Sequence, residues 1–211
     1  MSWEESIFKI KPYSDIKMNQ QFQKTSDAIT GYASIFSQND WVEFDNIVNN
    51  IFKNAVEIFE TPKLGDSRNE YIDLRVARFI VRKNGHSTIV NKPYSVEILN
   101  VLTRANFIDL VEQRTRLENL KILRMQLNSM EKNSFVGIHA DSENDPAYEV
   151  TAVIRITSSY SGGELVLYDN QVQIVNQQNH SIFLMDSSIE HEVKTVTNGY
   201  RNSLIVVLGK D

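Results

Sequence analysis

The sequence contains no cysteine. Without thiols the chain cannot form disulfides, zinc–thiolate sites or iron–sulfur clusters, and it has no thiol nucleophile. It also lacks any apolar run approaching the ~18 residues that a membrane span needs. Its first residues do not show the basic segment and apolar core of a secretory signal. These absences lead us to expect a soluble, cytoplasmic protein without a membrane partner.

An excess of positive charge is missing as well. The formal net charge is -5 at pH 7, so the chain as a whole has no electrostatic footprint for nucleic acid, and we expect no such partner. Hydrophobic residues make up 41% and charged residues 23%, which is ordinary for a globular protein. A length of 211 residues without an internal repeat or linker predicts a single domain over 1–211. The sequence does not define the oligomeric state.

Helical periodicity dominates part of the first 119 residues. Apolar residues recur at helical spacing over 41–60, and their continuous face predicts that this helix packs against a sheet. Asp40 and Glu43 are predicted to form a capping box at its start. Two shorter helices are expected at 93–102, where Ser95 would be the N-cap, and at 107–114.

A β-hairpin is predicted before these shorter helices. Residues 75–82 alternate as in a strand, and Asn84-Gly85 is a strong two-residue turn signal before a second strand at 87–90. The basic residues of this hairpin could face an anionic ligand or form a solvated strand face, and both interpretations stay open. They are Arg75, Arg78, Arg82 and Lys83.

From residue 120 onward the sequence changes to short β-type runs separated by turn signals. Eight such runs are predicted, at 120–130, 134–139, 149–157, 164–168, 171–175, 181–185, 192–196 and 203–208. Helices followed by many short strands favour an α+β, mainly β fold, an antiparallel barrel or jelly roll buttressed by N-terminal helices. We therefore assign 1–119 to helical support and leading strands, and 120–211 to the β core.

Two of the four histidines stand in a pattern typical of a metal site. His139 and Asp141 are separated by one residue, so on a strand both side chains point to the same face. His191 precedes another β-type run, and a barrel can bring the two strand ends together. Two imidazoles and one carboxylate on one face are the ligand set of a non-haem Fe(II) centre with open coordination positions.

A basic residue follows the second histidine at a suggestive distance. Arg201 lies ten positions after His191, and a guanidinium can bind a carboxylate bidentately while keeping its charge when buried. Ser203 shares the strand face of Arg201 and could donate its hydroxyl proton to the same carboxylate. This pair therefore suits a dicarboxylate co-substrate.

Residues from about 120 to 208 resemble the double-stranded β-helix (jelly roll/cupin-like) core of the Fe(II)/2-oxoglutarate-dependent oxygenase superfamily, nearest to its prolyl 4-hydroxylase-like branch. Four segments carry the resemblance, in the order that this branch shows. They are Phe135-Val-Gly-Ile-His-Ala-Asp141, Ser161-Gly-Gly-Glu-Leu-Val166, Glu190-His-Glu-Val-Lys-Thr-Val196 and Gly199-Tyr-Arg-Asn-Ser203.

The resemblance implies a metal site and a reaction. His139, Asp141 and His191 would bind Fe(II), Arg201 would bind the distal carboxylate of 2-oxoglutarate, and no further catalytic residue is assigned. The implied activity is hydroxylation of an aliphatic C–H with 2-oxoglutarate and O2, giving succinate and CO2, with ascorbate as a candidate stimulant. Halogenases of the superfamily replace the carboxylate ligand with a small residue, so the presence of Asp141 favours hydroxylation.

The resemblance also shows a departure from the branch. Tyrosines that often help to hold 2-oxoglutarate are missing from 126–130, and Arg155 falls near another position where tyrosine is common. Arg124, Gln126, Asn128 and Arg155 are therefore candidates for lining the pocket. The expected substrate is a small molecule, such as a free amino acid, or a peptide or protein side chain. Its selection is expected to depend on loops 61–70 and 142–148.

Two other functions are compatible with the same residues. A non-catalytic jelly-roll binding module would use both histidines for packing only. Another metal-dependent cupin enzyme would usually need an additional His or Glu ligand near the first motif, where only Glu143 is present.

Overall fold

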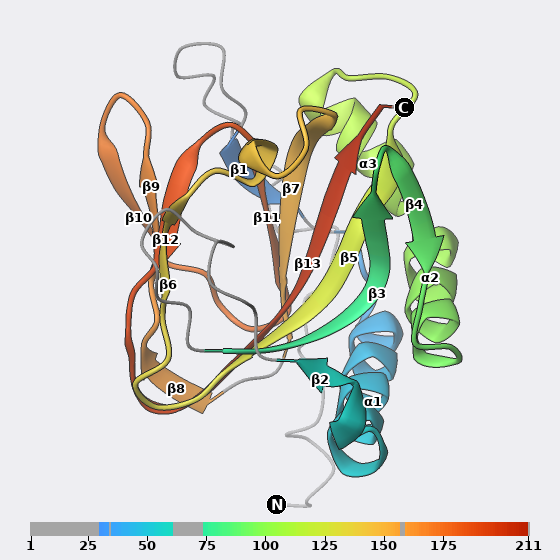
Figure 1. Ribbon diagram of the computed structural model, residues 1–211, viewed down its shortest axis with the longest axis vertical. Helices are drawn as coiled ribbons and strands as arrows, with labels where there is room; N and C mark the ends of the chain where they lie inside the picture. Colours follow the sequence, from blue (N-terminus) through green and yellow to red (C-terminus); the bar gives the residue numbers. More distant parts are fainter. Residues whose placement is uncertain (1–29, 34, 61–73, 157–158, 211) are drawn as a thin grey trace, which may run out of the picture.

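The computed structural model describes residues 30–33, 35–60, 74–156 and 159–210. These residues form two antiparallel sheets that face one another, with α-helices against the outer face of the larger sheet (Figure 1). The expected mainly β architecture with helical support is thereby confirmed. Loop 61–70 lies outside the described residues, and none of the helices within them is long and apolar enough to cross a membrane.

The larger sheet has nine strands in the described part of the chain. Its order is β1-β11-β7-β13-β5-β3-β2, with β4 paired to β3 and β8 paired to β13. The strands are β1 (Thr30–Ala33), β2 (Phe59–Glu60), β3 (Arg75–Lys83), β4 (His86–Ile89), β5 (Lys121–Met130), β7 (Tyr148–Arg155), β8 (Ser159–Gly162), β11 (Ser181–Asp186) and β13 (Val196–Gly209).

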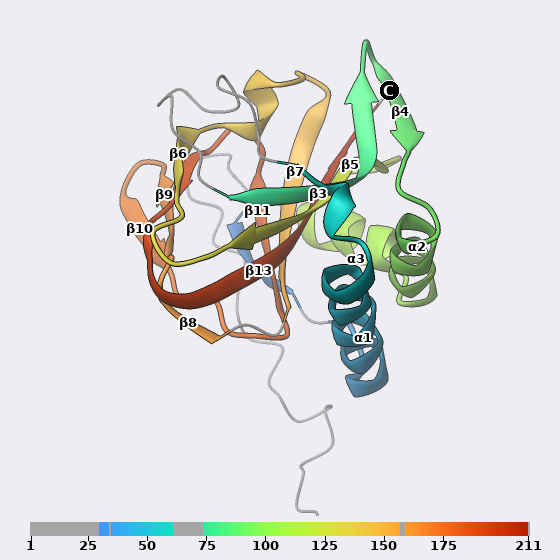
Figure 2. The ribbon, with the colours of Figure 1, turned by 60° about the horizontal axis from the view of Figure 1, so that its bottom comes forward.

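The smaller sheet faces the inner side of the larger sheet (Figure 2). Its order is β10-β9-β12-β6, so β6 and β12 are neighbours although about fifty residues separate them in the sequence. The strands are β6 (Val136–His139), β9 (Leu165–Tyr168), β10 (Val172–Val175) and β12 (Glu190–Val193).

The alternation of side chains along β13 separates two apolar layers. Leu204 and Val206 belong to the core between the larger sheet and the helices, together with Phe44. Ile205 and Arg201 point the other way, into the space between the two sheets. Successive side chains of a strand alternate between its faces, so one strand supplies both the helix-facing core and the lining of the inner cavity.

The helices begin and end somewhat differently from the prediction. α1 begins after Ser37, whose hydroxyl accepts a hydrogen bond from Asp40 N while the Asp40 carboxylate accepts one from Ser37 N. The predicted Asp40–Glu43 capping box was therefore wrong, because Asp40 is the third helical residue and not the cap. The helical elements are α1 (Gln38–Asn54), η2 (Val56–Ile58), α2 (Tyr94–Arg104), α3 (Phe107–Thr115) and η3 (Asp141–Glu143).

The end of α1 and the start of α2 also differ from the prediction. α1 stops at Asn54, because Phe59 and Glu60 pair with β3 as strand β2 and do not continue the helix. The residue capping α2 is Pro93, and the predicted cap Ser95 is buried inside the helix with no hydrogen bond from its hydroxyl. Periodicity located these helices correctly, but their ends depend on tertiary pairing that periodicity does not report.

The predicted strands were found close to their expected bounds except around β12 and β13, whereas β1 and β2 were not predicted. The hairpin turn is confirmed, with Asn84 at φ +51° and Gly85 at φ +77°. The run predicted at 192–196 is β12 at 190–193, and β13 begins at Val196, well before the predicted 203. Gly199, at φ +72°, lies so close to Ser159 that a Cβ there would collide with its carbonyl. The first part of β13 therefore pairs with β8, a strand that the sequence did not reveal.

Candidate metal centre

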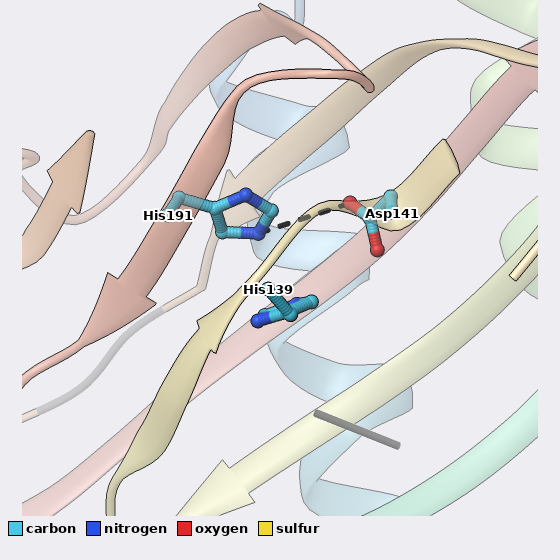
Figure 3. A group of neighbouring side chains, drawn as sticks. All are labelled: His139, Asp141 and His191. Carbon is cyan, nitrogen blue, oxygen red and sulfur yellow. Dashed lines mark ion pairs between the residues drawn. The ribbon is translucent and has the colours of Figure 1, made fainter. Parts of the chain in front are cut away.

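Three metal-ligand side chains converge in the space between the sheets (Figure 3). His139 ends β6, Asp141 begins η3, and His191 lies on β12. The antiparallel pairing of β6 and β12 places His191 opposite His139, with ring centroids 4.3 Å apart. One ligand atom from each residue lies within 4.8 Å of the others. The fold thus brings the three predicted ligands together around a space suited to one ion.

Backbone carbonyls orient both imidazoles. His139 Nδ1 lies 2.9 Å from the carbonyl oxygen of Gly137, and His191 Nδ1 lies 2.9 Å from that of Ile189. A carbonyl accepts only, so each Nδ1 carries the proton and donates it. Each Nε2 is then left with its lone pair, and neither makes a hydrogen bond to a described residue. Metal-binding histidines characteristically show this arrangement.

The carboxylate ligand is held by one hydroxyl group, which a second hydroxyl contacts in turn. Asp141 Oδ2 accepts a hydrogen bond of 2.7 Å from Thr151 Oγ1, which in turn lies 3.0 Å from Ser187 Oγ. On its other side, Asp141 Oδ1 lies 3.9 Å from Arg124 NH1. These contacts fix the carboxylate while its oxygens remain available to a metal between the two imidazoles.

The protonation states of the centre favour a cation. Burial alone would raise the pKa of Asp141, but the nearby charges, led by that of His191, bring this pKa below its ordinary value. The pKa of His191 is lowered by burial and by the charge of His139, although Asp141 opposes the effect. An ionised carboxylate and neutral imidazoles are the forms that bind metals. The donor set and its open side therefore fit Fe(II).

Arg201 lines the same cavity from β13. Its side chain is almost fully buried, its NH1 lies 3.6 Å from Met130 Sδ, and its Nε has no hydrogen-bond partner. No carboxylate of the described residues pairs with it. Burial and the charge of Arg155 hold the pKa of Arg201 well below its ordinary value, with Tyr160 acting in the opposite sense. A buried guanidinium without a counter-charge is arranged to receive an anion.

A glycine provides the space for this arginine. Gly163, in the Gly-Gly turn before β9, has φ +65°, and a Cβ there would lie 3.1 Å from Arg201 Cδ and 3.0 Å from Val196 Cγ2. Only glycine combines that backbone conformation with so close an approach. The turn recognised in the sequence thus has a physical role beside the arginine.

Ser203 and Arg155 lie side by side behind the cavity. Arg155 NH1 donates to Ser203 Oγ over 3.0 Å, so the Ser203 hydroxyl accepts this bond and keeps its own proton as a donor. Arg155 does not line the metal cavity; it lines a separate hollow with Tyr160 and Gln177. Its place among the predicted pocket residues was therefore wrong for the metal cavity, although its charge acts on Arg201.

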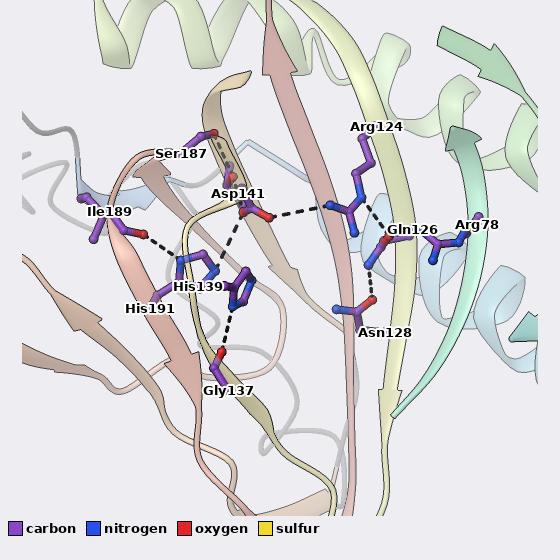
Figure 4. A network of polar contacts seen from close by, with 11 residues as sticks. Arg78, Arg124, Gln126, Asn128, Gly137, His139, Asp141, Ser187, Ile189 and His191 are labelled. Atoms are coloured by element: carbon purple, nitrogen blue, oxygen red, sulfur yellow. Dashed lines mark hydrogen bonds and ion pairs between the residues drawn. The ribbon is translucent and has the colours of Figure 1, made fainter. Parts of the chain in front are cut away.

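A polar wall faces the metal ligands across the cavity (Figure 4). Arg124, Gln126 and Asn128 project from β5, as the sequence predicted, and Arg78 joins them from β3. Gln126 links the group, because its Oε1 accepts from Arg124 Nε at 3.0 Å and its Nε2 donates to Asn128 Oδ1 at 2.7 Å. Thr151 was missed by sequence reasoning, since nothing marks a strand threonine as the neighbour of a ligand ten residues away.

The other candidates lie away from the centre. Arg75 pairs with Glu131 at the surface, and Arg82 Nε donates to Asp145 Oδ2 over 2.8 Å. The second contact attaches the loop at 142–148 to β3. Of the hairpin residues that could face an anion, Arg78 lines the cavity and the other three do not.

The core of the chain matches a known family. Residues 125–208 match the model of the 2OG-Fe(II) oxygenase superfamily. No curated protein matches the chain.

Solved structures match most of the chain. A 2OG-Fe(II) oxygenase family oxidoreductase from Burkholderia pseudomallei is 24% identical, with a TM-score of 0.70 over 87% of this chain and 84% of its own. A prolyl hydroxylase from Trichoplax adhaerens, in complex with a peptide fragment of the hypoxia inducible factor oxygen degradation domain, is 18% identical, with a TM-score of 0.64 over 85% and 83%.

A third structure shows a different activity on the same fold. It is the epimerase SnoN from nogalamycin biosynthesis in complex with Fe3+, α-ketoglutarate and nogalamycin RO. This protein is 9% identical, with a TM-score of 0.64 over 87% of this chain and 78% of its own. At these identities the matches establish the double-stranded β-helix fold and leave the reaction open.

Proposed function

We propose that this chain, whose residues 125–208 carry the core of the 2OG-Fe(II) oxygenase superfamily, is an Fe(II)- and 2-oxoglutarate-dependent dioxygenase that hydroxylates an aliphatic C–H. The observation that carries the proposal is a single cavity lined by both the His139–Asp141–His191 triad and the buried Arg201. A binding module would need neither preformed ligands nor a buried cation without a counter-charge.

The three ligands have distinct roles in holding the metal. His139 and His191 would bind through Nε2, because their Nδ1 protons are given to backbone carbonyls. Asp141 would supply the anionic ligand, and the Thr151 hydroxyl keeps it ionised and oriented. Fe(II) bound here would supply the activation of O2 that the cleavage of an aliphatic C–H requires.

Arg201 would bind the distal carboxylate of 2-oxoglutarate. Its fork is a buried cation that lines this cavity. Ser203, which lies behind the cavity wall two residues further along β13, keeps a hydroxyl proton that could be donated to the same carboxylate. The anchor would direct the 2-oxo acid end of the co-substrate toward the triad. A bound carboxylate would also relieve the repulsion between Arg201 and Arg155.

Apolar residues exclude water from the region between these two groups. They occupy the cavity wall from both sheets, and a dry wall strengthens the attraction between a carboxylate and a guanidinium. The residues are Leu74, Val76, Met130, Val136, Val153, Leu165, Met185, Val193 and Ile205.

The proposal is tested by measuring succinate formation from 2-oxoglutarate in air with Fe(II) and ascorbate. The panel should contain free amino acids, short peptides and small metabolites, because superfamily structures include one with a peptide and one with a small molecule. We expect Fe(II)-dependent succinate and a product that is heavier by one oxygen atom. A hydroxylase is excluded if every compound that stimulates succinate is recovered without added oxygen. An iron-independent reaction would exclude the metal assignment.

A further inference from the structure

We infer that the primary substrate carries a carboxylate and that Arg124, assisted by Arg78, binds it at the polar wall of the cavity. This inference rests on the proposed function and names the substrate class of the same site. It depends on where Arg124 points, on the hydrogen-bonding capacity it has left, and on the charge of the cavity.

Arg124 lies beside the metal ligands and is partly exposed. It projects from β5 toward Asp141, with NH1 3.9 Å from Oδ1, and it lines the cavity beside the triad (Figure 4). Its side chain is 19% exposed, whereas Arg201 is only 2% exposed as a residue. Arg124 is therefore the more accessible of these two arginines and lies within reach of a ligand beside the metal.

Most of the hydrogen-bonding capacity of Arg124 is unused. Its Nε donates to Gln126 Oε1, but neither terminal nitrogen makes a hydrogen bond to any of the described residues. The 3.9 Å contact with Asp141 is too long for a hydrogen bond. A metal on Asp141 would share that negative charge, and the attraction on Arg124 would weaken further. The two terminal nitrogens match the spacing of a carboxylate.

Arg78 adds positive charge to the same wall. It lies on the neighbouring strand β3, with NH1 3.5 Å from Gln126 Oε1 and Nε 3.5 Å from the exposed carboxylate of Glu60. Both contacts are long, and Glu60 does not line the cavity. Arg78 therefore contributes charge beside Arg124 and holds Gln126 in place between them.

The charge of the loaded cavity calls for an anion. Among the described residues, three arginines and one carboxylate line it, so the protein supplies two more positive charges than negative ones. The two charges of Fe(II) and the two of 2-oxoglutarate cancel each other. Because Arg78 also lies 3.5 Å from the carboxylate of Glu60, the excess that remains is one positive charge, at Arg124. A neutral substrate would leave it uncompensated in a partly dry site.

One carboxylate cannot contact both Arg201 and Arg124. In the pairing of β13 with β5, Arg201 stands opposite Met130, and Arg124 lies six residues further along β5. Six residues of strand span roughly 20 Å. The distal carboxylate of 2-oxoglutarate, held at Arg201, is therefore not the group that meets Arg124. Arg124 lies beside the metal ligands, where the primary substrate must also bind.

The experiment measures binding without turnover. Protein loaded with Mn(II) and 2-oxoglutarate under argon is melted in the presence of paired probes, namely amino acids and dipeptides and the corresponding C-terminal carboxamides. We expect at least one acid to raise Tm more than its amide. In Arg124→Gln this difference should disappear. The matched control Arg75→Gln removes the same charge from an arginine that is paired with Glu131 outside the cavity, and it should keep the difference.

Kinetics then distinguish the two possible carboxylates. For the preferred acid, Arg124→Gln should lower kcat/KM by on the order of a hundredfold while KM for 2-oxoglutarate stays near the wild-type value. A rise confined to the 2-oxoglutarate KM would overturn the inference and assign Arg124 to the co-substrate. Amides that stabilise as well as acids, or an acid preference that survives Arg124→Gln, would also overturn it. None of these outcomes bears on Fe(II)-dependent succinate formation, which tests the proposed function separately.

Discussion

Replacing Arg201 with methionine should separate co-substrate binding from folding. Methionine keeps the apolar stem and removes the guanidinium, so 2-oxoglutarate loses two charge-assisted hydrogen bonds. Such bonds contribute about 1.5–3 kcal/mol each. The charge of Arg155 and the hydroxyl of Tyr160 stay nearby and compensate in part, which places the loss near the lower end of the sum. About 2.7 kcal/mol corresponds to a hundredfold rise in the 2-oxoglutarate KM.

The same variant should fold at least as well as the wild type without ligands. Arg201 is a buried cation with no carboxylate partner among the described residues, and replacing such a charge with an apolar side chain is often neutral or stabilising. We therefore expect an unchanged or higher Tm for the ligand-free protein, measured by calorimetry. Arg201→Lys should recover only part of the affinity, because an ammonium lacks the planar fork. A wild-type 2-oxoglutarate KM in Arg201→Met would refute the assignment.

Three further changes test the metal centre and its support. Alanine at any one of the three ligand positions should abolish turnover and weaken Fe(II) binding, measured by titration. The circular dichroism spectrum should remain that of the folded protein. Activity in one variant would remove that residue from the ligand set. Thr151→Val removes a hydrogen bond that lowers the pKa of Asp141, so this pKa should rise. As the pH is lowered, the variant should therefore lose Fe(II) affinity at a higher pH than the wild type. Superimposable profiles of Fe(II) affinity against pH would contradict this role of Thr151. Gly163→Ala should cost about 1–3 kcal/mol of unfolding free energy in urea and raise the 2-oxoglutarate KM, because the new methyl group meets the Arg201 stem at a strained φ; wild-type values of both would show that the turn has room.

The metal centre was predictable because its signals are local. His139 and Asp141 share a strand end at fixed spacing, and the β-type runs indicated that a barrel would bring His191 to them. The pairing of β6 with β12 confirms that geometry, although His191 lies within its strand and not before it. The sequence also identified Arg124 and Asn128 as cavity residues, because the alternation of side chains along a single strand is enough to place them on the same face.

The supporting contacts were not predictable, because they depend on pairing between distant segments. Thr151 reaches Asp141 only because β7 lies behind η3, and Arg78 reaches the cavity only because β3 pairs with β5. The early end of α1 has a similar cause, since Phe59 takes part in β2. Periodicity describes a segment by itself, whereas these features follow from neighbours that single-sequence patterns do not identify.

The most direct test of the central claim is an anaerobic titration of the Fe(II)-loaded protein with 2-oxoglutarate, followed by the visible absorption band that a 2-oxo acid gives on binding Fe(II). The account predicts a band that saturates at one 2-oxoglutarate per bound Fe(II), is lost in His191→Ala and needs far more 2-oxoglutarate in Arg201→Met. A wild-type protein that binds Fe(II) but shows no such band, or a band unchanged in both variants, would contradict it.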